Sequence, residues 1–304
     1  MSQSQRQRAT GYLAPEGFIE ELRTELGEVS ASYGRLLISP GPPKPAAWVA
    51  NIWLDPIEIS IASIGDAAKR LRAIQRNWAL YPHAQHRRAA LIEAKLPKVS
   101  ARPLVFPAAA PTAPLGSWTL VDANTVLASA HCTCPFPNGV ARFVEDKRAP
   151  PSRAYLKLWE ALTRLGTHPK PGERCLDLGG SPGGWTWVLA TLGARVISVD
   201  KAPLDPAVAA MSGVEVRRES AFGLGPRTIG PIDWLFSDVV CYPARLLRLV
   251  ERWLELGTCR RFVCTLKFQG ATDHETARRF AAIGGSRLVH LHHNKHELTW
   301  MMPA

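Results

Sequence analysis

A glycine-rich turn follows an apolar run in the second half of the chain, where residues 176–187 read LDLGGSPGGWTW. Glycine adopts backbone conformations that other residues avoid, and it lets a ligand approach the main chain. The dinucleotide fingerprint needs its second glycine at Ser181 or Pro182, depending on the starting glycine. The Walker pattern needs a lysine after Gly184, where Trp185 stands. The turn therefore does not predict a pyrophosphate or triphosphate site.

An acidic residue, Asp200, ends the next apolar run about twenty residues further on, where a ribose diol is held in α/β nucleotide-binding folds. A ligand with a ribose but no phosphates fits both features, and S-adenosylmethionine (SAM) is such a ligand. We expect its amino-acid end to contact the turn and its ribose to contact Asp200. The candidate cofactor-binding residues are Gly179, Ser181, Pro182, Gly183, Gly184, Trp185 and Asp200.

From about residue 150 onward, apolar runs alternate with amphipathic segments, a pattern typical of an α/β fold with a mostly parallel sheet. The last two predicted strands are separated only by HNKH, so they must form an antiparallel hairpin. Seven strands are predicted, at 174–178, 195–199, 214–217, 234–237, 261–266, 288–292 and 298–302. Helices are predicted at 153–165, 184–192, 244–256 and 272–283.

The first 150 residues predict a smaller α+β region. Helices are expected over 15–27 and 66–77, strands over 35–39 and 48–54, and two further strands around a turn at 122–124. Five prolines between residues 97 and 114 indicate a linker. We divide the chain into an N-terminal α+β domain at 1–96, a proline-rich linker with a strand segment at 97–150, and an α/β domain at 151–304.

The stretches LDLGGSPGGWTWVL and VISVDKAPL resemble the SAM site of the FtsJ-like RNA ribose 2′-O-methyltransferases. The resemblance implies a Rossmann-like SAM-dependent methyltransferase fold for 151–304 and a ribose 2′-OH of RNA as the methyl acceptor, with a cytidine of 23S rRNA as the expected target. It also implies a ferredoxin-like RNA-recognition domain at 1–96 and a reduced THUMP-like segment within 97–150. Ser220 stands where the family usually has an Asp near the adenine.

The same family carries a Lys-Asp-Lys-Glu tetrad, whose counterparts here are Lys157, Asp238, Lys267 and Glu297. A lysine can accept a proton only if its pKa is lowered, and a second lysine nearby lowers it by repulsion. We predict that Lys267 accepts the 2′-OH proton, while Lys157 lowers the pKa of Lys267 and holds the ribose. Asp238 is expected to contact both the SAM methyl end and the lysines, and Glu297 to orient the lysine pair.

The net charge of +11 is concentrated in one segment: residues Lys69 to Arg102 hold nine Lys or Arg and one acid. Such a segment favours a polyanion through counterion release, so we expect it to contact RNA. No run of 18 apolar residues is present, which predicts no membrane span. The six scattered cysteines favour a reducing, cytoplasmic location.

No metal site is expected. HCTC at 131–134 lacks a second ligand pair at zinc-finger spacing, and the histidines at 290, 292, 293 and 296 are expected to line an RNA-facing rim beside Glu297. Two functional alternatives stay open: a 2′-O-methyltransferase of the same fold acting on tRNA or another RNA, and a catalytically silent RNA-binding relative. A nicotinamide-dependent oxidoreductase is disfavoured by the missing second glycine.

Overall fold

A computed structural model of the chain describes residues 8–303 and separates into two compact units. Unit 1 comprises Met1–Pro103 and Ala110–Arg142, and unit 2 comprises Leu104–Ala109 and Phe143–Ala304. Residues 110–142 group with the N-terminal residues because their strands pair with strands from the first eighty residues. The three-part division drawn from the sequence stays a prediction.

Unit 2 is built on one seven-stranded sheet with the strand order β12-β11-β10-β13-β14-β16-β15. All pairs from β12 to β14 are parallel, whereas β16 is antiparallel to both β14 and β15. The strands are β10 (Arg174–Leu178), β11 (Arg195–Val199), β12 (Val214–Arg217), β13 (Trp234–Ser237), β14 (Arg261–Lys267), β15 (Arg287–Val289) and β16 (Glu297–Met302).

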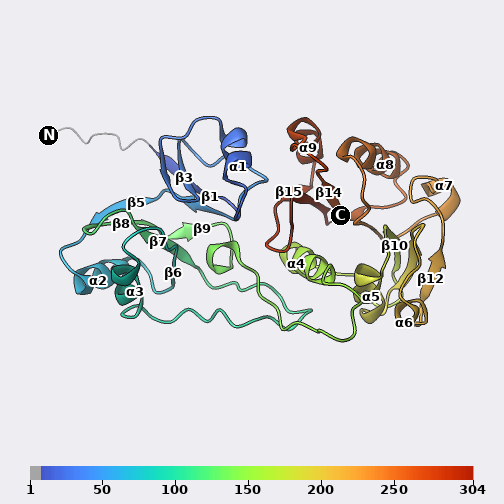
Figure 1. Ribbon diagram of the computed structural model, residues 1–304, viewed down its shortest axis with the longest axis horizontal. Helices are drawn as coiled ribbons and strands as arrows, with labels where there is room; N and C mark the ends of the chain where they lie inside the picture. Colours follow the sequence, from blue (N-terminus) through green and yellow to red (C-terminus); the bar gives the residue numbers. More distant parts are fainter. Residues whose placement is uncertain (1–7, 304) are drawn as a thin grey trace. The chain divides into compact units, whose positions relative to one another are not determined.

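Helices cover both faces of this sheet, with α4, α5 and α6 on one side and α8 and α9 on the other (Figure 1). Leu246, Leu249, Val250 and Trp253 form the buried stripe of α8, at the spacing that a helix needs to face a core. The helices are α4 (Tyr155–Leu165), α5 (Gly184–Thr191), α6 (Pro206–Ala209), α7 (Pro226–Ile229), α8 (Pro243–Glu255) and α9 (His274–Ala281).

The strand predicted over 288–292 is wrong at its C-terminal end, because β15 stops at Val289. The ring Nε2 of His290 lies 3.0 Å from the Lys295 carbonyl oxygen, and the amides of His292 and His293 donate to a side chain on α4 instead of to a neighbouring strand. The hairpin between β15 and β16 is present but has a longer loop than HNKH. Side-chain hydrogen bonds thus replace the strand ladder here.

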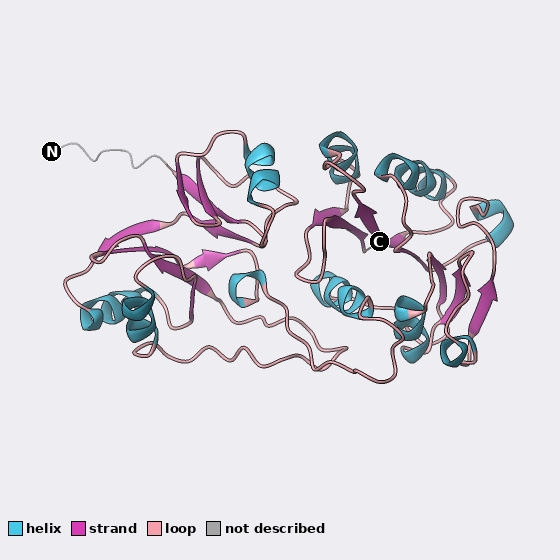
Figure 2. Ribbon diagram, viewed as in Figure 1, coloured by secondary structure: helices cyan, strands magenta, loops and turns pink. Residues whose placement is uncertain are grey.

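Unit 1 contains two sheets (Figure 2). One has the order β2-β3-β1-β4-β9, and the other β5-β8-β7-β6. Its elements are β1 (Ala9–Leu13), α1 (Ile19–Leu26), β2 (Ala31–Tyr33), β3 (Leu36–Pro40), β4 (Asn51–Leu54), β5 (Ile57–Ser60), α2 (Ile64–Ile74), β6 (Trp78–Leu80), α3 (His86–Glu93), β7 (Gly116–Leu120), β8 (Thr125–Ser129), β9 (His131–Cys132) and the 3₁₀ turn η1 (Pro137–Gly139).

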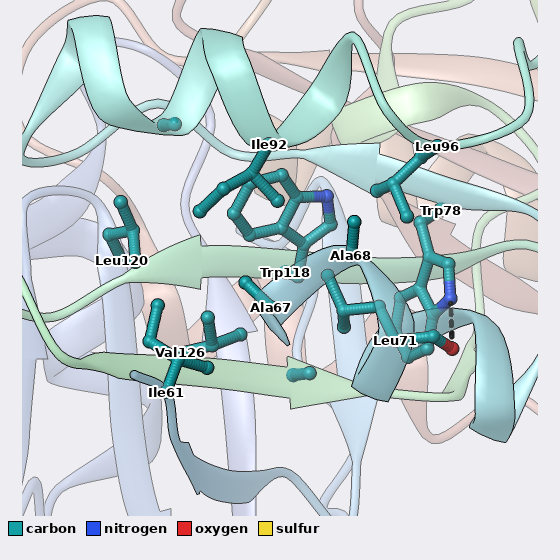
Figure 3. Close-up of a cluster of buried hydrophobic side chains, with 12 residues drawn as sticks. Ile61, Ala67, Ala68, Leu71, Trp78, Ile92, Leu96, Trp118, Leu120 and Val126 are labelled. Atoms are coloured by element: carbon teal, nitrogen blue, oxygen red, sulfur yellow. Dashed lines mark hydrogen bonds between the residues drawn. The ribbon is translucent and has the colours of Figure 1, made fainter. Parts of the chain in front are cut away.

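The core of the second sheet lies between α2, α3 and the strands β7 and β8 (Figure 3). Ser63 caps the start of α2 by accepting the Asp66 amide at 3.1 Å. Trp118 is fully buried, and the indole N–H of Trp78 donates to the Leu71 carbonyl at 3.0 Å. The remaining core residues are Ile61, Ala67, Ala68, Leu71, Ala89, Ile92, Leu96, Leu120, Val126 and Ala128.

Adjacent residues on α3 offer a matched test of this core. Ile92 is 0% exposed and Leu91 is 47% exposed. We expect Ile92→Ala to lower the free energy of unfolding of unit 1 by about 2–5 kcal/mol, because a cavity replaces buried methyl groups. Leu91→Ala should change it by less than about 0.5 kcal/mol. Urea unfolding of the full chain followed by circular dichroism measures both, and equal effects would contradict this packing.

Candidate active site

The candidate residues meet at one edge of the unit 2 sheet. Gly179, Asp200 and Asp238 directly follow the parallel strands β10, β11 and β13, and Lys267 is the last residue of β14. Strand order reverses on the two sides of β10, and open α/β sheets bind ligands outside the carboxyl ends of the strands at such a point. Because β16 is antiparallel, its first residue, Glu297, reaches this same edge and lies directly opposite Lys267.

Four side chains form an ion-paired cluster there. The Nζ of Lys157, from α4, lies 2.9 Å from Asp238 Oδ1 and 2.6 Å from Glu297 Oε1. The Nζ of Lys267 lies 3.2 Å from the same Asp238 Oδ1. The structure therefore brings all four predicted tetrad residues together.

The two lysines of the cluster have different surroundings. Burial disfavours the charge of Lys157, whose side chain is 9% exposed, but Asp238 and Glu297 outweigh burial and raise the pKa of Lys157. Among residues 8–303, the ion pair of Lys267 is with Asp238 alone, and its side chain is 21% exposed. Lys157 is thus a charged, enclosed ammonium, and Lys267 is the lysine that faces outward.

Packing within the chain and backbone conformation require glycine at three positions of the turn. Gly179 has φ +83°, and a Cβ there would lie 2.6 Å from the Val239 Cα. Gly183 has φ +123°, a conformation that side-chain-bearing residues rarely adopt. A Cβ on Gly184 would lie 2.6 Å from the Ser152 Oγ. The turn is therefore compact for reasons of packing, in addition to any ligand that it contacts.

A pocket opens beside the turn, and three of the predicted cofactor residues line it: Gly179, Asp200 and Ser220. Further lining comes from Val199, Lys201, Glu219, Ala221, Phe222, Val239, Val240 and Arg245. The predicted residues Ser181, Pro182, Gly183, Gly184, Trp185 and Asp238 are not part of this lining.

Hydrogen bonds within unit 2 account for the positions of Ser181 and Trp185. The amide of Ser181 donates to Asp200 Oδ2 at 3.1 Å, which fixes the carboxylate beside the turn. Trp185 is buried, and its Nε1 donates to the Ala154 carbonyl at 3.0 Å. Trp185 therefore packs inside unit 2, and Ser181 acts on the pocket through Asp200.

Sequence reasoning missed Asp177, the acid inside the strand β10. Its side chain is buried and accepts a 2.6 Å hydrogen bond from the Thr186 hydroxyl, which also contacts Ser198 Oγ at 2.9 Å. Burial raises the pKa of Asp177 to about 7, the Thr186 hydrogen bond opposes this, and the negative charges of Asp238 and Asp200 add to it. The signal available was a carboxylate within an apolar strand, directly before the glycine turn.

The basic segment expected to contact RNA belongs to unit 1, on α2, on α3 and in the loops that follow them. Of its nine cationic residues, only Arg88 is partly buried. The other eight side chains are exposed: Lys69, Arg70, Arg72, Arg76, Arg87, Lys95, Lys98 and Arg102. Arg70 is partly neutralised by Asp66, whose Oδ2 lies 3.0 Å from its Nε.

The final histidines differ from expectation. His290 is buried, so the prediction that it lines an exposed rim is wrong, and the ring Nδ1 of His293 lies 2.8 Å from the Glu160 carboxylate. Within residues 8–303, no group of three or more His, Cys, Asp or Glu side chains is placed to share a metal ion. No helix in the described part of the chain is long and apolar enough to cross a membrane.

Residues 150–278, all within unit 2, match the model of the FtsJ-like methyltransferase family. The tetrad spans a longer range than that match, because Glu297 lies beyond its end.

The relatives found in comparison carry a more specific name. The chain is 40% identical over 172 residues to the ribosomal RNA large subunit methyltransferase M of Halorhodospira halophila, covering 54% of this chain and 50% of that protein. The protein of the same name from Alkalilimnicola ehrlichii is 38% identical over 186 residues, with coverages of 57% and 51%. The chain thus spans about half the length of the curated relatives it matches. A solved structure, TrmN from Thermus thermophilus, aligns over 97% of this chain and 99% of its own at 14% identity and a TM-score of 0.38.

The buried carboxyl of Asp177 gives stability a specific pH dependence. Below about pH 3 this group is mostly protonated in both the folded and the unfolded chain. As the pH rises towards 7, the unfolded chain loses a proton that the folded chain keeps, so the free energy of unfolding falls by up to about 1.4 kcal/mol per pH unit. The loss levels off once the pH exceeds the folded pKa.

Asp177→Asn keeps the shape of the side chain and removes this titration. We expect its free energy of unfolding, relative to wild type, to rise between about pH 4.5 and about pH 7, as measured by urea unfolding. Glu215→Gln, at an exposed carboxylate on β12, is the control. A difference between Asp177→Asn and wild type that stays constant over this range would contradict the assignment.

Proposed function

We propose that this protein is a SAM-dependent methyltransferase that methylates a ribose 2′-OH of RNA. The observation that carries the proposal is the convergence of Lys157, Asp238, Lys267 and Glu297 at the carboxyl edge of the sheet. A reaction centre commonly combines side chains from several elements that are far apart in the sequence. A surface ion pair involves only two residues and does not need such an arrangement. The FtsJ-like match and the names of the relatives agree with this chemistry.

The pocket beside the glycine turn fits SAM. The Oδ1 and Oδ2 of Asp200 each accept one backbone amide, from Ala202 and Ser181, and a carboxylate oxygen can accept a further hydrogen bond from a ribose hydroxyl. Phe222 and Val240 add apolar surface to the pocket. When bound, SAM supplies an electrophilic methyl group on a sulfonium. Asp200 would hold the ribose, and Gly179 and Ser220 would lie against the rest of the nucleoside.

The two lysines have different roles in the proposed reaction. Lys157 is held as an ammonium between two carboxylates, so it orients the ribose as a hydrogen-bond donor and presents positive charge beside the second lysine. Lys267, in its neutral form, would take the proton of the 2′-OH onto Nζ while the 2′ oxygen forms its bond to the methyl carbon; the methyl–sulfur bond would break at the same time, and S-adenosylhomocysteine would leave as the neutral thioether. Asp238 and Glu297 keep both Nζ atoms in position. Support comes from the greater exposure and the smaller number of ionic partners of Lys267.

RNA is the proposed acceptor because the exposed cations between residues 69 and 102 suit a polyanion and because the relatives are named as ribosomal RNA methyltransferases. We propose a cytidine of 23S rRNA as the target, with recognition by the N-terminal region. Mass-spectrometric mapping of 2′-O-methylation in total RNA, with and without the gene, tests this. A site lost from tRNA would favour the alternative substrate, and no lost site together with RNA binding would favour a silent relative.

Replacing Lys267 tests the proton acceptor. We expect Lys267→Ala to lower the rate of tritium transfer from SAM to RNA by about 10²–10⁴-fold, because the 2′-OH loses its base. Lys267→Arg should be nearly as slow, since arginine keeps the charge beside Asp238 but does not deprotonate. SAM affinity, measured by calorimetry, should be nearly unchanged in both variants. Lys170→Ala, at an exposed lysine of unit 2, is the control, and wild-type turnover of either Lys267 variant would refute the assignment.

Replacing Asp200 tests the cofactor site. Asp200→Asn is expected to weaken SAM binding by about 10-fold to 100-fold, because hydrogen bonds to a charged acceptor contribute about 1.5–3 kcal/mol. RNA affinity, measured by filter binding, should stay the same because the basic segment is unaltered. Glu215→Gln again serves as the exposed control. Unchanged SAM affinity in Asp200→Asn would place the ribose elsewhere.

A further inference from the structure

A buried carboxylate on α4 has no part in the chemistry proposed above. Glu160 is 0% exposed although it is charged, and such residues are rarely fully buried without partners. Its Oε1 accepts the Arg164 Nε at 2.8 Å and the His292 amide at 2.9 Å. Its Oε2 accepts the His293 amide at 3.1 Å and lies 2.8 Å from the His293 ring Nδ1.

Three of these four contacts come from the loop between β15 and β16. This loop delivers Glu297, the first residue of β16 and a member of the tetrad. Within the loop, Asn294 Nδ2 donates to the Glu297 carbonyl at 3.1 Å, and the His290 ring contacts the Lys295 carbonyl at 3.0 Å. The loop therefore has hydrogen bonds within itself, and the hydrogen bonds to Glu160 hold it against α4.

Glu160 lies three residues after Lys157 on α4, so the two side chains share one face of the helix. Lys157 contacts Glu297 directly at 2.6 Å, and Glu160 holds the segment that ends four residues before Glu297. A single helix face thus makes two links to the same hairpin, one within the tetrad and one at its entrance.

The charge of Glu160 suits this purpose. Burial favours its neutral form, but Arg164, the His293 ring and the His292 amide outweigh burial and lower the pKa of Glu160 to about 2. The carboxylate is therefore ionised throughout the neutral range. A buried ion pair adds little net stability compared with packed apolar groups, but its several directed hydrogen bonds define one geometry.

We infer that Glu160 is a positioning residue of the tetrad, which holds the His292–His293 segment against α4 and thereby sets where Glu297 meets Lys157. This inference rests on the proposed methyl transfer. It extends that proposal because Glu160 touches none of the tetrad side chains through the contacts described and acts through the loop.

The test compares Glu160→Gln in two backgrounds. A glutamine at this position turns an N–H₂ group toward one set of loop donors, so the loop should shift. We expect kcat for RNA methylation to fall by about 10-fold to 100-fold, a loss typical of a small misplacement, with KM for RNA and SAM affinity nearly unchanged. In a Glu297→Gln background, where the side chain to be positioned is already altered, Glu160→Gln should cost less than about 2-fold.

A purely structural role predicts a different result. If Glu160→Gln only reduces the fraction of folded protein, its effect multiplies equally in both backgrounds, and that outcome would overturn the inference, as would an unchanged kcat. Glu251→Gln, which removes the ion pair between α8 and Arg279, is the matched control and should leave kcat unaltered. Activity of the wild-type chain is measured first, so that failure of the proposed function is seen separately.

A second variant keeps the inference testable if Glu160→Gln does not fold. His293→Ala removes one loop donor and leaves Glu160 its two loop amides and Arg164. We expect a smaller fall in kcat, which also disappears in the Glu297→Gln background. Hydrogen exchange provides a readout independent of activity: residues 291–297 should lose amide protection in His293→Ala while β10 and β13 keep theirs. Unaltered protection of the loop would contradict the inference.

Discussion

Unit 2 is organised around the placement of two like charges beside one carboxylate oxygen. The Nζ atoms of Lys157 and Lys267 lie 2.9 Å and 3.2 Å from Asp238 Oδ1. Two ammonium groups repel one another, and the arrangement is held because Asp238 is shared and Glu297 adds a second negative charge. Each of the four residues comes from a different element, so their meeting requires the whole sheet and α4 to be in register.

The antiparallel strand β16 makes this convergence possible. Parallel strands bring only their carboxyl ends to the edge of the sheet where the four side chains meet, and Asp238 and Lys267 reach it in that way. Glu297 is at the start of its strand, so it reaches the same edge only because β16 runs in the opposite direction between β14 and β15. The loop before β16 must then be held in place, and Glu160 on α4 supplies the carboxylate that does so.

Elements of unit 2 were predicted more closely than those of unit 1. Strands β10, β11, β12 and β13 have the predicted bounds. For β10, β11 and β13 the reason is that strands buried in a parallel sheet are largely apolar, whereas β12 lies at the edge of the sheet and has no buried residue. In unit 1, the turn at 122–124 between β7 and β8 was predicted correctly, whereas β1, β5, β6 and α3 were not. The strands β1, β5 and β6 are short and pair with strands that are distant in the chain, so their structure depends on that pairing.

The sequence by itself supplied Lys157, Asp238, Lys267 and Glu297 as candidates, through the resemblance of its motifs to those of the FtsJ-like methyltransferases. It also disfavoured a pyrophosphate or triphosphate site, since Ser181 and Pro182 stand where a phosphate-binding turn needs glycine. Only the tertiary structure decided the burial of Asp177 and Glu160, the shared oxygen of Asp238 and the end of β15 at Val289. The physical reason is that burial, ion pairing and hydrogen bonding depend on neighbours that are remote in the chain, up to 133 residues apart between Glu160 and His293.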